Sequence, residues 1–255
     1  MKQTIRKFFR THIRSKIKNE LSRQRLKFLL WDVYGYYSLL FAKHISLAKK
    51  LKLLKQCCII DWNILHAHKP CEITPVLLAI LEPDSNKSQQ STIIEAGCWL
   101  GGGSAKFSHG CAIAGCGLHV YDSFEGVEYS DANTEKAIFF GTYIGQIEVV
   151  KENISRYGNI SVCEFHKGWF AHTFKNFNTP CKVVYVDCDL AKGTLEVITA
   201  VQPYLQKGGK IFTQDYHIKP IKKMLTDENT WKNCNLSQPS IKPLKRNMAL
   251  IKFED

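Results

Sequence analysis

The pattern of apolar and polar positions changes near residue 91 of this 255-residue chain. Through residues 1–30, apolar side chains recur every three to five positions among lysines and arginines, which predicts a basic amphipathic helix. Residues 31–80 are predicted to form further helices and loops, and the polar stretch 83–90 a linker. We therefore expect a basic helical extension or lid at 1–82 and a main domain at 91–255.

In the main domain, short apolar runs alternate with helical patterns. The predicted strands are 92–98, 118–122, 161–165, 183–187, 210–213 and 248–253. The predicted helices are 104–114, 144–157 and 195–205, with Gly208–Gly209 as the exit turn of the last and an irregular, proline-containing stretch before the final strand. This alternation is typical of a doubly wound, mostly parallel α/β sheet with helices on both faces. Such sheets bind ligands at the carboxyl ends of their strands.

Composition agrees with a soluble globular chain, since 45 % of the residues are hydrophobic and 23 % are charged. The longest apolar run, 28–42, contains Asp32 and is shorter than the ~20 residues that a membrane-spanning helix needs. The ten cysteines form no Cys-x-x-Cys motif and no Cys/His cluster with zinc spacing. Because the N-terminus also lacks the apolar stretch of a secretory signal, we expect a reducing, cytoplasmic location.

The positive charge is concentrated in the first fifth of the chain. Residues 1–55 hold 15 Lys and Arg against two acids, a net charge of +13, whereas the other 200 residues hold 20 bases and 21 acids. A basic appendage on a neutral domain indicates a contact with an anionic surface, and its amphipathic helix suits the inner face of a membrane. The alternatives are a helix packed on its own domain or on a second copy in a homo-oligomer. Nucleic acid is not expected, because the main domain lacks a basic groove composition.

A glycine-rich turn follows the first strand of the main domain, in the sequence Glu95-Ala96-Gly97-Cys98-Trp99-Leu100-Gly101-Gly102-Gly103-Ser104. Glycines let a ligand approach the backbone, and the following helix offers free N–H groups to an anion. The turn is neither a dinucleotide motif nor a P-loop. Asp122 ends the second strand about 25 positions later, where a carboxylate can accept hydrogen bonds from both hydroxyls of a ribose.

Carboxylates also follow two later strands of the predicted sheet. Asp187 and Asp189 end one strand and Asp215 ends the next, so these three side chains are expected to converge on one crevice. Hard divalent ions such as Mg²⁺ prefer such oxygen ligands, although aspartates at strand ends also cap helices. Asp187, His217 and His166 are candidate general bases.

Five motifs together resemble a known family. They are Glu-x-Gly-x-x-x-Gly-Gly-x-Ser, Asp-Ser-Phe-Glu-Gly, Gly168-Trp169-Phe170, Asp-x-Asp-Leu and Gly-Gly-x-Ile-x-x-x-Asp-Tyr, in that order over residues 91–225. The set resembles the macrocin/mycinamicin/novobiocin-type sugar O-methyltransferases, which are class I S-adenosylmethionine-dependent enzymes that use Mg²⁺. The resemblance does not extend to the basic N-terminus.

The resemblance implies a role for each motif. The methionine end of S-adenosylmethionine would lie on Glu95, Gly97, Cys98, Trp99, Gly101 and Ser104. Its ribose would contact Asp122 and Ser123, and its adenine Gly168, Trp169 and Phe170. The metal would be held by Asp187, Asp215 and Gln214, and a substrate hydroxyl would be a further ligand. Of the candidate bases named above, we expect Asp187 or His217 to be catalytic.

Two departures from the family pattern bear on the metal. Gln214 stands where the family has an aspartate, so the site loses one negative charge. Ala191-Lys192-Gly193-Thr194 replaces the family's aromatic residue and serine, and Lys192 could supply charge in place of a metal. The expected reaction is methyl transfer to a sugar hydroxyl of a glycoconjugate, with a lipid-linked or surface polysaccharide sugar as the hypothesis for the acceptor. The alternatives are methylation of a soluble phenolic or secondary metabolite, and a non-catalytic scaffold that kept the fold.

Overall fold

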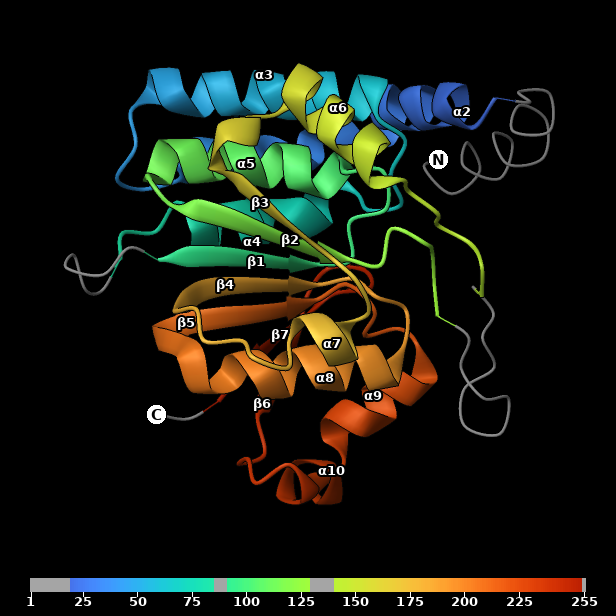
Figure 1. The fold of residues 1–255 in the computed structure, drawn as a ribbon. Helices are drawn as coiled ribbons and strands as arrows, with labels where there is room; N and C mark the ends of the chain where they lie inside the picture. The colour runs from blue at the N-terminus through green and yellow to red at the C-terminus, as the bar shows by residue number, and fades with distance from the viewer. Residues whose placement is uncertain (1–18, 85–90, 129–139, 254–255) are drawn as a thin grey trace, which may run out of the picture.

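A computed structural model describes residues 19–84, 91–128 and 140–253, so the first 18 residues of the helix predicted for 1–30 lie outside the described part of the chain. Within it, seven strands form one sheet in the order β3-β2-β1-β4-β5-β7-β6 (Figure 1). Strands β1 to β5 run parallel, and β7 runs antiparallel to both β5 and β6. The strands are β1 (Thr92–Ala96), β2 (Gly117–Asp122), β3 (Cys163–Lys167), β4 (Cys181–Val186), β5 (Leu205–Thr213), β6 (Ser240–Pro243) and β7 (Ala249–Lys252).

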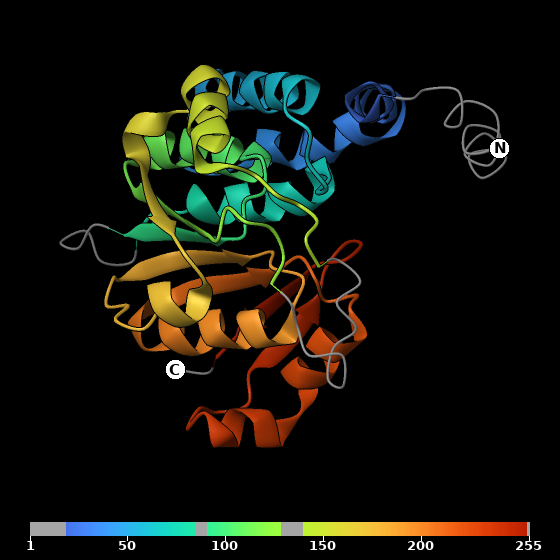
Figure 2. The same cartoon turned by 45° about the vertical axis from the view of Figure 1, so that its right-hand side comes forward.

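Helices cover both faces of this sheet. On one side lie α3 (Leu47–Asn63), α4 (Pro70–Ile80), α5 (Gly102–Ala114) and α6 (Ile147–Tyr157). On the other lie α7 (Phe170–Thr173), α8 (Ala191–Val201), α9 (Lys219–Thr226) and, further out, α10 (Glu228–Asn233). The rotated view in Figure 2 separates the blue and green helices above the sheet from the orange and red helices below it. The doubly wound α/β prediction is confirmed.

Side-chain alternation along the strands divides the core into two layers. Ile93 and Tyr185 pack with the helices on the α5 side, whereas their neighbours Ile94 and Val184 pack with those on the α8 side. Because successive residues of a strand point to opposite faces, a strand buried on both faces is mostly apolar along its length. All five residues of β1 are buried, as a central parallel strand requires.

The N-terminal helices share the core of the main domain. Leu53 and Ile60 of α3 and Ile73 of α4 belong to the same apolar cluster as Ile93 and Leu118 of the sheet. Before α3, the chain forms α2 (Glu20–Lys27), a π-helical turn η2 (Phe28–Asp32) and a 3₁₀ helix η3 (Val33–Phe41). None of the helices in the described ranges has the length and hydropathy needed to cross a bilayer.

Two local predictions are wrong. Gly208–Gly209 does not form the exit turn of a helix, because α8 ends at Val201 and both glycines lie inside β5. There the register with β4 shifts between Cys181 and Val183, and Gly208 adopts a φ of +76°, which a glycine tolerates in an irregular strand.

The stretch before the final strand is also more regular than predicted. It contains α9, α10 and β6, joined to one another by short turns. Its prolines are compatible with this structure, since Pro220 lies in the first turn of α9 and Pro243 ends the edge strand β6. Two short loops, η4 (Ile160–Val162) and η5 (Gln202–Tyr204), are 3₁₀ turns that precede β3 and β5.

Candidate active site

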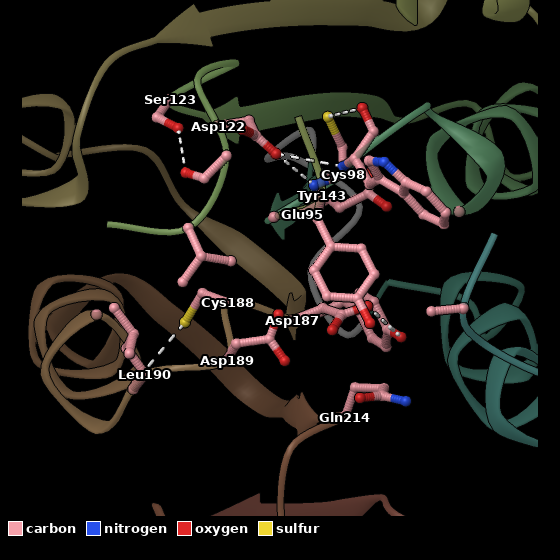
Figure 3. A pocket seen from close by; sticks show the side chains of 18 of the residues that line it. Glu95, Cys98, Asp122, Ser123, Tyr143, Asp187, Cys188, Asp189, Leu190 and Gln214 are labelled. Carbon is pink, nitrogen blue, oxygen red and sulfur yellow. Dashed lines mark hydrogen bonds between the residues drawn. The ribbon is translucent and has the colours of Figure 1, made fainter. Parts of the chain in front are cut away.

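A pocket opens at the carboxyl ends of β1, β2 and β4, where the strand order reverses between β1 and β4 (Figure 3). Ligand crevices of doubly wound sheets lie at this position. Most of the residues predicted for the site line it: Glu95, Gly97, Cys98, Trp99, Asp122, Ser123, Gly168, Trp169, Phe170, Asp187, Gln214 and His217. Gly101, Ser104 and Asp215 do not line the pocket, and neither does His166, which lies on β3.

Gly97 lies between two strand ends that approach each other closely. Its amide donates to the Tyr121 carbonyl at 2.9 Å, and the Asp187 amide donates to the Ala96 carbonyl at 2.8 Å. Gly97 has a φ of +91°, and a Cβ atom there would lie 1.8 Å from the Asp187 carbonyl oxygen. Only glycine fits both the backbone conformation and the space.

Asp122 connects the glycine-rich turn to the end of β2. One carboxylate oxygen accepts hydrogen bonds from the amides of Cys98 at 2.7 Å and Trp99 at 3.3 Å. The other accepts from the amide of Phe124 at 2.7 Å. A carboxylate has about four acceptor positions, so one remains for a ligand donor from the pocket.

Glu95 is a buried carboxyl in the pocket wall, only 1 % exposed. Its Oε2 atom has no hydrogen-bond partner in the described part of the chain. Burial raises the pKa of Glu95 to about 8. A buried acceptor without a partner is costly, so this atom suits a cationic or N–H donor from a bound ligand.

Three aspartates converge on the opposite side of the pocket, where Figure 3 shows Asp187 and Asp189 beside Gln214. Burial and the neighbouring charge of Asp189 raise the pKa of Asp215 to about 8, and burial raises that of Asp189 to about 6. Burial, with the charges of Asp215 and Asp189, raises the pKa of Asp187 well above its ordinary range. This concentration of carboxyl groups favours a bound cation.

Asp215 is placed so that it orients the loop after β4. Its Oδ2 atom accepts from the amides of Cys188 at 3.0 Å and Asp189 at 2.9 Å, and its buried Oδ1 atom has no hydrogen-bond partner among the described residues. Asp189 adopts a φ of +61°, an uncommon conformation for a non-glycine residue. Lys192 lies 3.5 Å from Glu128 and 3.9 Å from Glu196, so it pairs with these glutamates rather than with the aspartates.

The sequence analysis missed one wall of the pocket, which residues 65–68 form. His66 Nε2 lies 2.6 Å from Asp61 Oδ1, and His66 Nδ1 lies 2.9 Å from the His68 carbonyl oxygen. Lys106 Nζ lies 2.5 Å from Asp61 Oδ1 and 2.7 Å from His68 Nε2, and Tyr36 donates to Asp61 at 2.7 Å. Burial by itself raises the pKa of Asp61. The charges of Lys106 and His66 and their hydrogen bonds to the carboxylate outweigh burial and lower this pKa to about 2.

This wall brings the N-terminal helices onto the glycine-rich turn. A Cβ atom on Gly102, at the start of α5, would lie 2.9 Å from the Cβ atom of His66. The signals available in the sequence were the His66-Ala67-His68 motif and Lys106, the one lysine or arginine of the segment 102–114. Tyr143 and Asn247 line the same pocket from segments for which no role was predicted.

The sheet order, the glycine-rich turn at its switch point and the aspartates at the neighbouring strand ends define a class I methyltransferase fold. The chain belongs to the macrocin O-methyltransferase (TylF) family, whose model matches residues 80–241. This confirms the resemblance seen in the sequence motifs.

One curated relative is similar in sequence. It is the 8-demethyl-8-(2,3-dimethoxy-alpha-L-rhamnosyl)-tetracenomycin-C 4'-O-methyltransferase of Streptomyces olivaceus, 29 % identical over 140 residues. The match covers 49 % of this chain and 53 % of the relative, so it spans about half the length of that protein.

Solved structures share the fold. The O-methyltransferase NovP has a TM-score of 0.64 at 18 % identity, covering 91 % of this chain and all of that one. The calicheamicin methyltransferase CalS11 has a TM-score of 0.55 at 15 % identity, covering 88 % and 91 % of the two chains. The S-adenosylhomocysteine-bound methyltransferase PaMTH1 of Podospora anserina has a TM-score of 0.50 at 13 % identity, covering 94 % and 98 %.

Proposed function

We propose that this protein transfers a methyl group from S-adenosylmethionine to a hydroxyl group of a sugar. The proposal rests on the pocket between the ends of β1 and β4, where the strand order reverses. There the turn at Gly97 and Asp122 faces the aspartates Asp187 and Asp189. The family match and the name of the Streptomyces olivaceus relative, a methyltransferase of a rhamnosyl compound, support a sugar acceptor.

The residues of the pocket fit the cofactor. The unpartnered Oε2 atom of Glu95 would accept from the ammonium group of the methionine end. The remaining acceptor position of Asp122 would take a ribose hydroxyl, and Trp169 and Phe170 would flank the adenine. When bound, S-adenosylmethionine supplies an electrophilic methyl group, and the protein supplies orientation and charge.

A sugar hydroxyl is a weak nucleophile, so the chain must help it lose a proton. Asp187 or His217, which both line the pocket, would take this proton. A raised pKa, as burial produces at Asp187, makes a carboxylate a stronger base near neutral pH. Asp187 and Gln214, backed by Asp215, would hold Mg²⁺, which lowers the pKa of a hydroxyl that it binds.

Calorimetric titration with S-adenosylmethionine, repeated with Mg²⁺ and with EDTA, tests the cofactor. We expect micromolar binding, followed by methyl transfer to a nucleotide sugar or glycoside in a radiolabelled methyl assay. Transfer to phenols in place of sugars would favour the secondary-metabolite alternative. Absence of cofactor binding under both conditions would favour the non-catalytic scaffold.

We further propose that the acceptor sugar is lipid-linked or part of a surface polysaccharide, met at the inner face of an anionic membrane. Large apolar side chains are exposed along η2, η3 and the start of α3: Leu29, Leu30, Val33, Tyr34, Tyr37, Phe41, Leu47 and Leu51. The first 55 residues around them carry a net charge of +13. Exposed aromatic side chains among basic residues suit an interfacial contact, to which each basic residue near the surface adds roughly 1 kcal/mol.

Vesicle flotation tests this membrane contact. A triple variant, Tyr34→Ser, Tyr37→Ser and Phe41→Ser, should lose binding to anionic vesicles, whereas Tyr204→Ser, an exposed tyrosine of η5, should not. Equal flotation of both variants would refute the proposal. If the triple variant changes the molar mass in light scattering and leaves flotation unaltered, the apolar face is a contact between two copies of the chain.

A further inference from the structure

Two histidines and a glutamate form a cluster on the outer strands β2 and β3, apart from the pocket. His119 of β2 pairs in register with Glu164 of β3, and Tyr121 pairs with His166. Because side chains two residues apart on a strand share a face, His119, Glu164 and His166 all point to the side covered by α7. The register of the two strands therefore brings three metal-ligating side chains together.

One ring nitrogen of each histidine and one carboxylate oxygen of Glu164 lie within 4.8 Å of one another. His119 Nε2 and His166 Nε2 each lie 3.4 Å from a carboxylate oxygen of Glu164, and His166 Nε2 lies 3.1 Å from His119 Nδ1. In a tetrahedral zinc site with bonds of about 2.0–2.1 Å, neighbouring ligand atoms lie about 3.3 Å apart. Because His119 contacts Glu164 through Nε2 and His166 through Nδ1, a shared zinc ion would be bound by one of these nitrogens, and the side chains would rotate to bring the three ligand atoms to this spacing.

We propose that His119, Glu164 and His166 form a zinc-binding site on the β2–β3 edge of the sheet, with water as the fourth ligand. Two imidazoles and one carboxylate with an open position are an established zinc donor set. Glu164 is 63 % exposed and β3 is an edge strand, so the ion has a route from solvent. None of the three residues lines the pocket, so the site does not depend on the proposed methyl transfer.

The surroundings hold the imidazole rings in place. The His166 ring stacks on the Tyr121 ring at 4.1 Å and 7°, and the Tyr121 ring stacks on Phe174 at 4.2 Å. Rings held in a fixed orientation in this way suit metal binding by histidine.

A second group, Asp61, His66 and His68, has comparable ligand spacing but does not favour a metal. Lys106 Nζ already lies 2.5 Å from Asp61 and 2.7 Å from His68 Nε2, so a cation of the protein occupies that position. No lysine or arginine is recorded in contact with the ring nitrogens or carboxylate of the β2–β3 cluster among the described residues.

Zinc at this edge would stiffen the approach to the pocket. β3 ends at Lys167, and the next residue, Gly168, donates its amide to the Asp122 carbonyl at 3.0 Å before the chain enters the pocket wall at Trp169. An ion that joins β2 to β3 would hold these two strand ends together. The ion would thus have a structural role.

The test is zinc titration of the full-length protein in competition with a chromophoric chelator, with excess Mg²⁺ present to fill oxygen-rich sites. We expect the Glu164→Gln and His119→Asn variants to bind one zinc ion about tenfold or more weakly than the wild type. His172→Gln changes an exposed histidine of α7 and should bind as the wild type does. Zinc should also raise the melting temperature of the wild type and not that of Glu164→Gln.

Binding of Co²⁺ in place of zinc distinguishes metal bound at this site from metal bound by any of the ten cysteines. The visible bands of tetrahedral Co²⁺ should appear without the intense near-ultraviolet band of thiolate ligands, and should disappear in Glu164→Gln. Equal zinc affinity in all variants, or a thiolate band that the variants do not alter, would overturn the proposal. S-adenosylmethionine binding measured on the same samples reports on the methyltransferase proposal independently.

Discussion

The ammonium group of Lys106 lies 2.5 Å from Oδ1 of Asp61, and both side chains are closed off from solvent. Asp61 belongs to α3 and Lys106 to α5, which begins at the glycine-rich turn. This ion pair joins the helices before the sheet to the helix that follows the glycine-rich turn. Residues 65–68 therefore form part of the pocket wall, and α3 and α4 form part of the core.

Removal of Lys106 should destabilise the fold severely. Lys106→Met leaves the buried Asp61 carboxylate without its cation, a loss of about 3–5 kcal/mol in the free energy of unfolding measured with urea. The double variant Asp61→Asn/Lys106→Met should recover part of that loss. Lys232→Met, which breaks the exposed pair with Glu228, is the control and should change little. If Lys106→Met changes the free energy of unfolding as little as Lys232→Met does, the ion pair with Asp61 does not stabilise the fold.

Gly97→Ala should abolish cofactor binding. The added methyl group would lie 1.8 Å from the Asp187 carbonyl oxygen, so the strand ends must separate. Gly115→Ala is a matched control, since Gly115 has a φ of +75° but nothing within 4 Å of the added Cβ atom. The control should lower stability by about 1 kcal/mol and leave binding intact. Wild-type affinity in Gly97→Ala, measured by calorimetry, would show that the turn does not hold the cofactor.

Stability without ligand should fall as the pH rises from 6.5 to 8. The pKa of Glu95 is about 8 in the folded chain and near 4.5 in the unfolded chain, so the folded state binds more protons in this range. Glu95 then contributes stability that is complete below pH 4.5 and is lost as the pH rises through 8. Buried histidines with lowered pKa act in the opposite direction, but their contribution fades above about pH 6.5, where the unfolded imidazole loses its proton, so the range is chosen above that value.

The Glu95→Gln variant isolates this contribution. Glutamine resembles the protonated acid and does not titrate. The decline in the free energy of unfolding between pH 6.5 and 8 should therefore be smaller by about 1–2 kcal/mol than in the wild type. Urea unfolding at several pH values measures the difference. Asp187 and Asp215, whose pKa values are also raised, should leave a residual decline in the variant. Parallel pH profiles for the two proteins would show that Glu95 is ionised in the folded state.

Gln214→Asp should strengthen Mg²⁺ binding about tenfold, because it adds a carboxylate beside Asp187. The same variant should be less stable than the wild type in EDTA, since the added charge joins three carboxyl groups whose pKa values are already raised. Thermal unfolding at a series of Mg²⁺ concentrations measures both effects. If Mg²⁺ does not raise the melting temperature of either protein, these residues do not form a metal site.

Local patterns were sufficient to predict much of the fold. Runs such as Thr92–Ala96 and Cys181–Val186 are mostly apolar on both faces, apart from Glu95 and Lys182, which is the property of central parallel strands. The turn at Gly97 and the strand-end aspartates could be placed at one edge because parallel strands all end there. The glycine pair in β5 and the helices α9 and α10 were misjudged, because pairing with β4 and packing on the core overrode the local turn signals.

The sequence by itself determined the alternating sheet, the glycine-rich turn and the strand ends at which Asp122, Asp187 and Gln214 line one pocket. These features follow from periodicity and hydrogen bonding between residues close in the chain or in adjacent strands. Only the tertiary structure decided that His66 and His68 form a wall of that pocket and that His119 meets His166. Such contacts join residues about 40 positions apart, and they arise from helix packing and strand register.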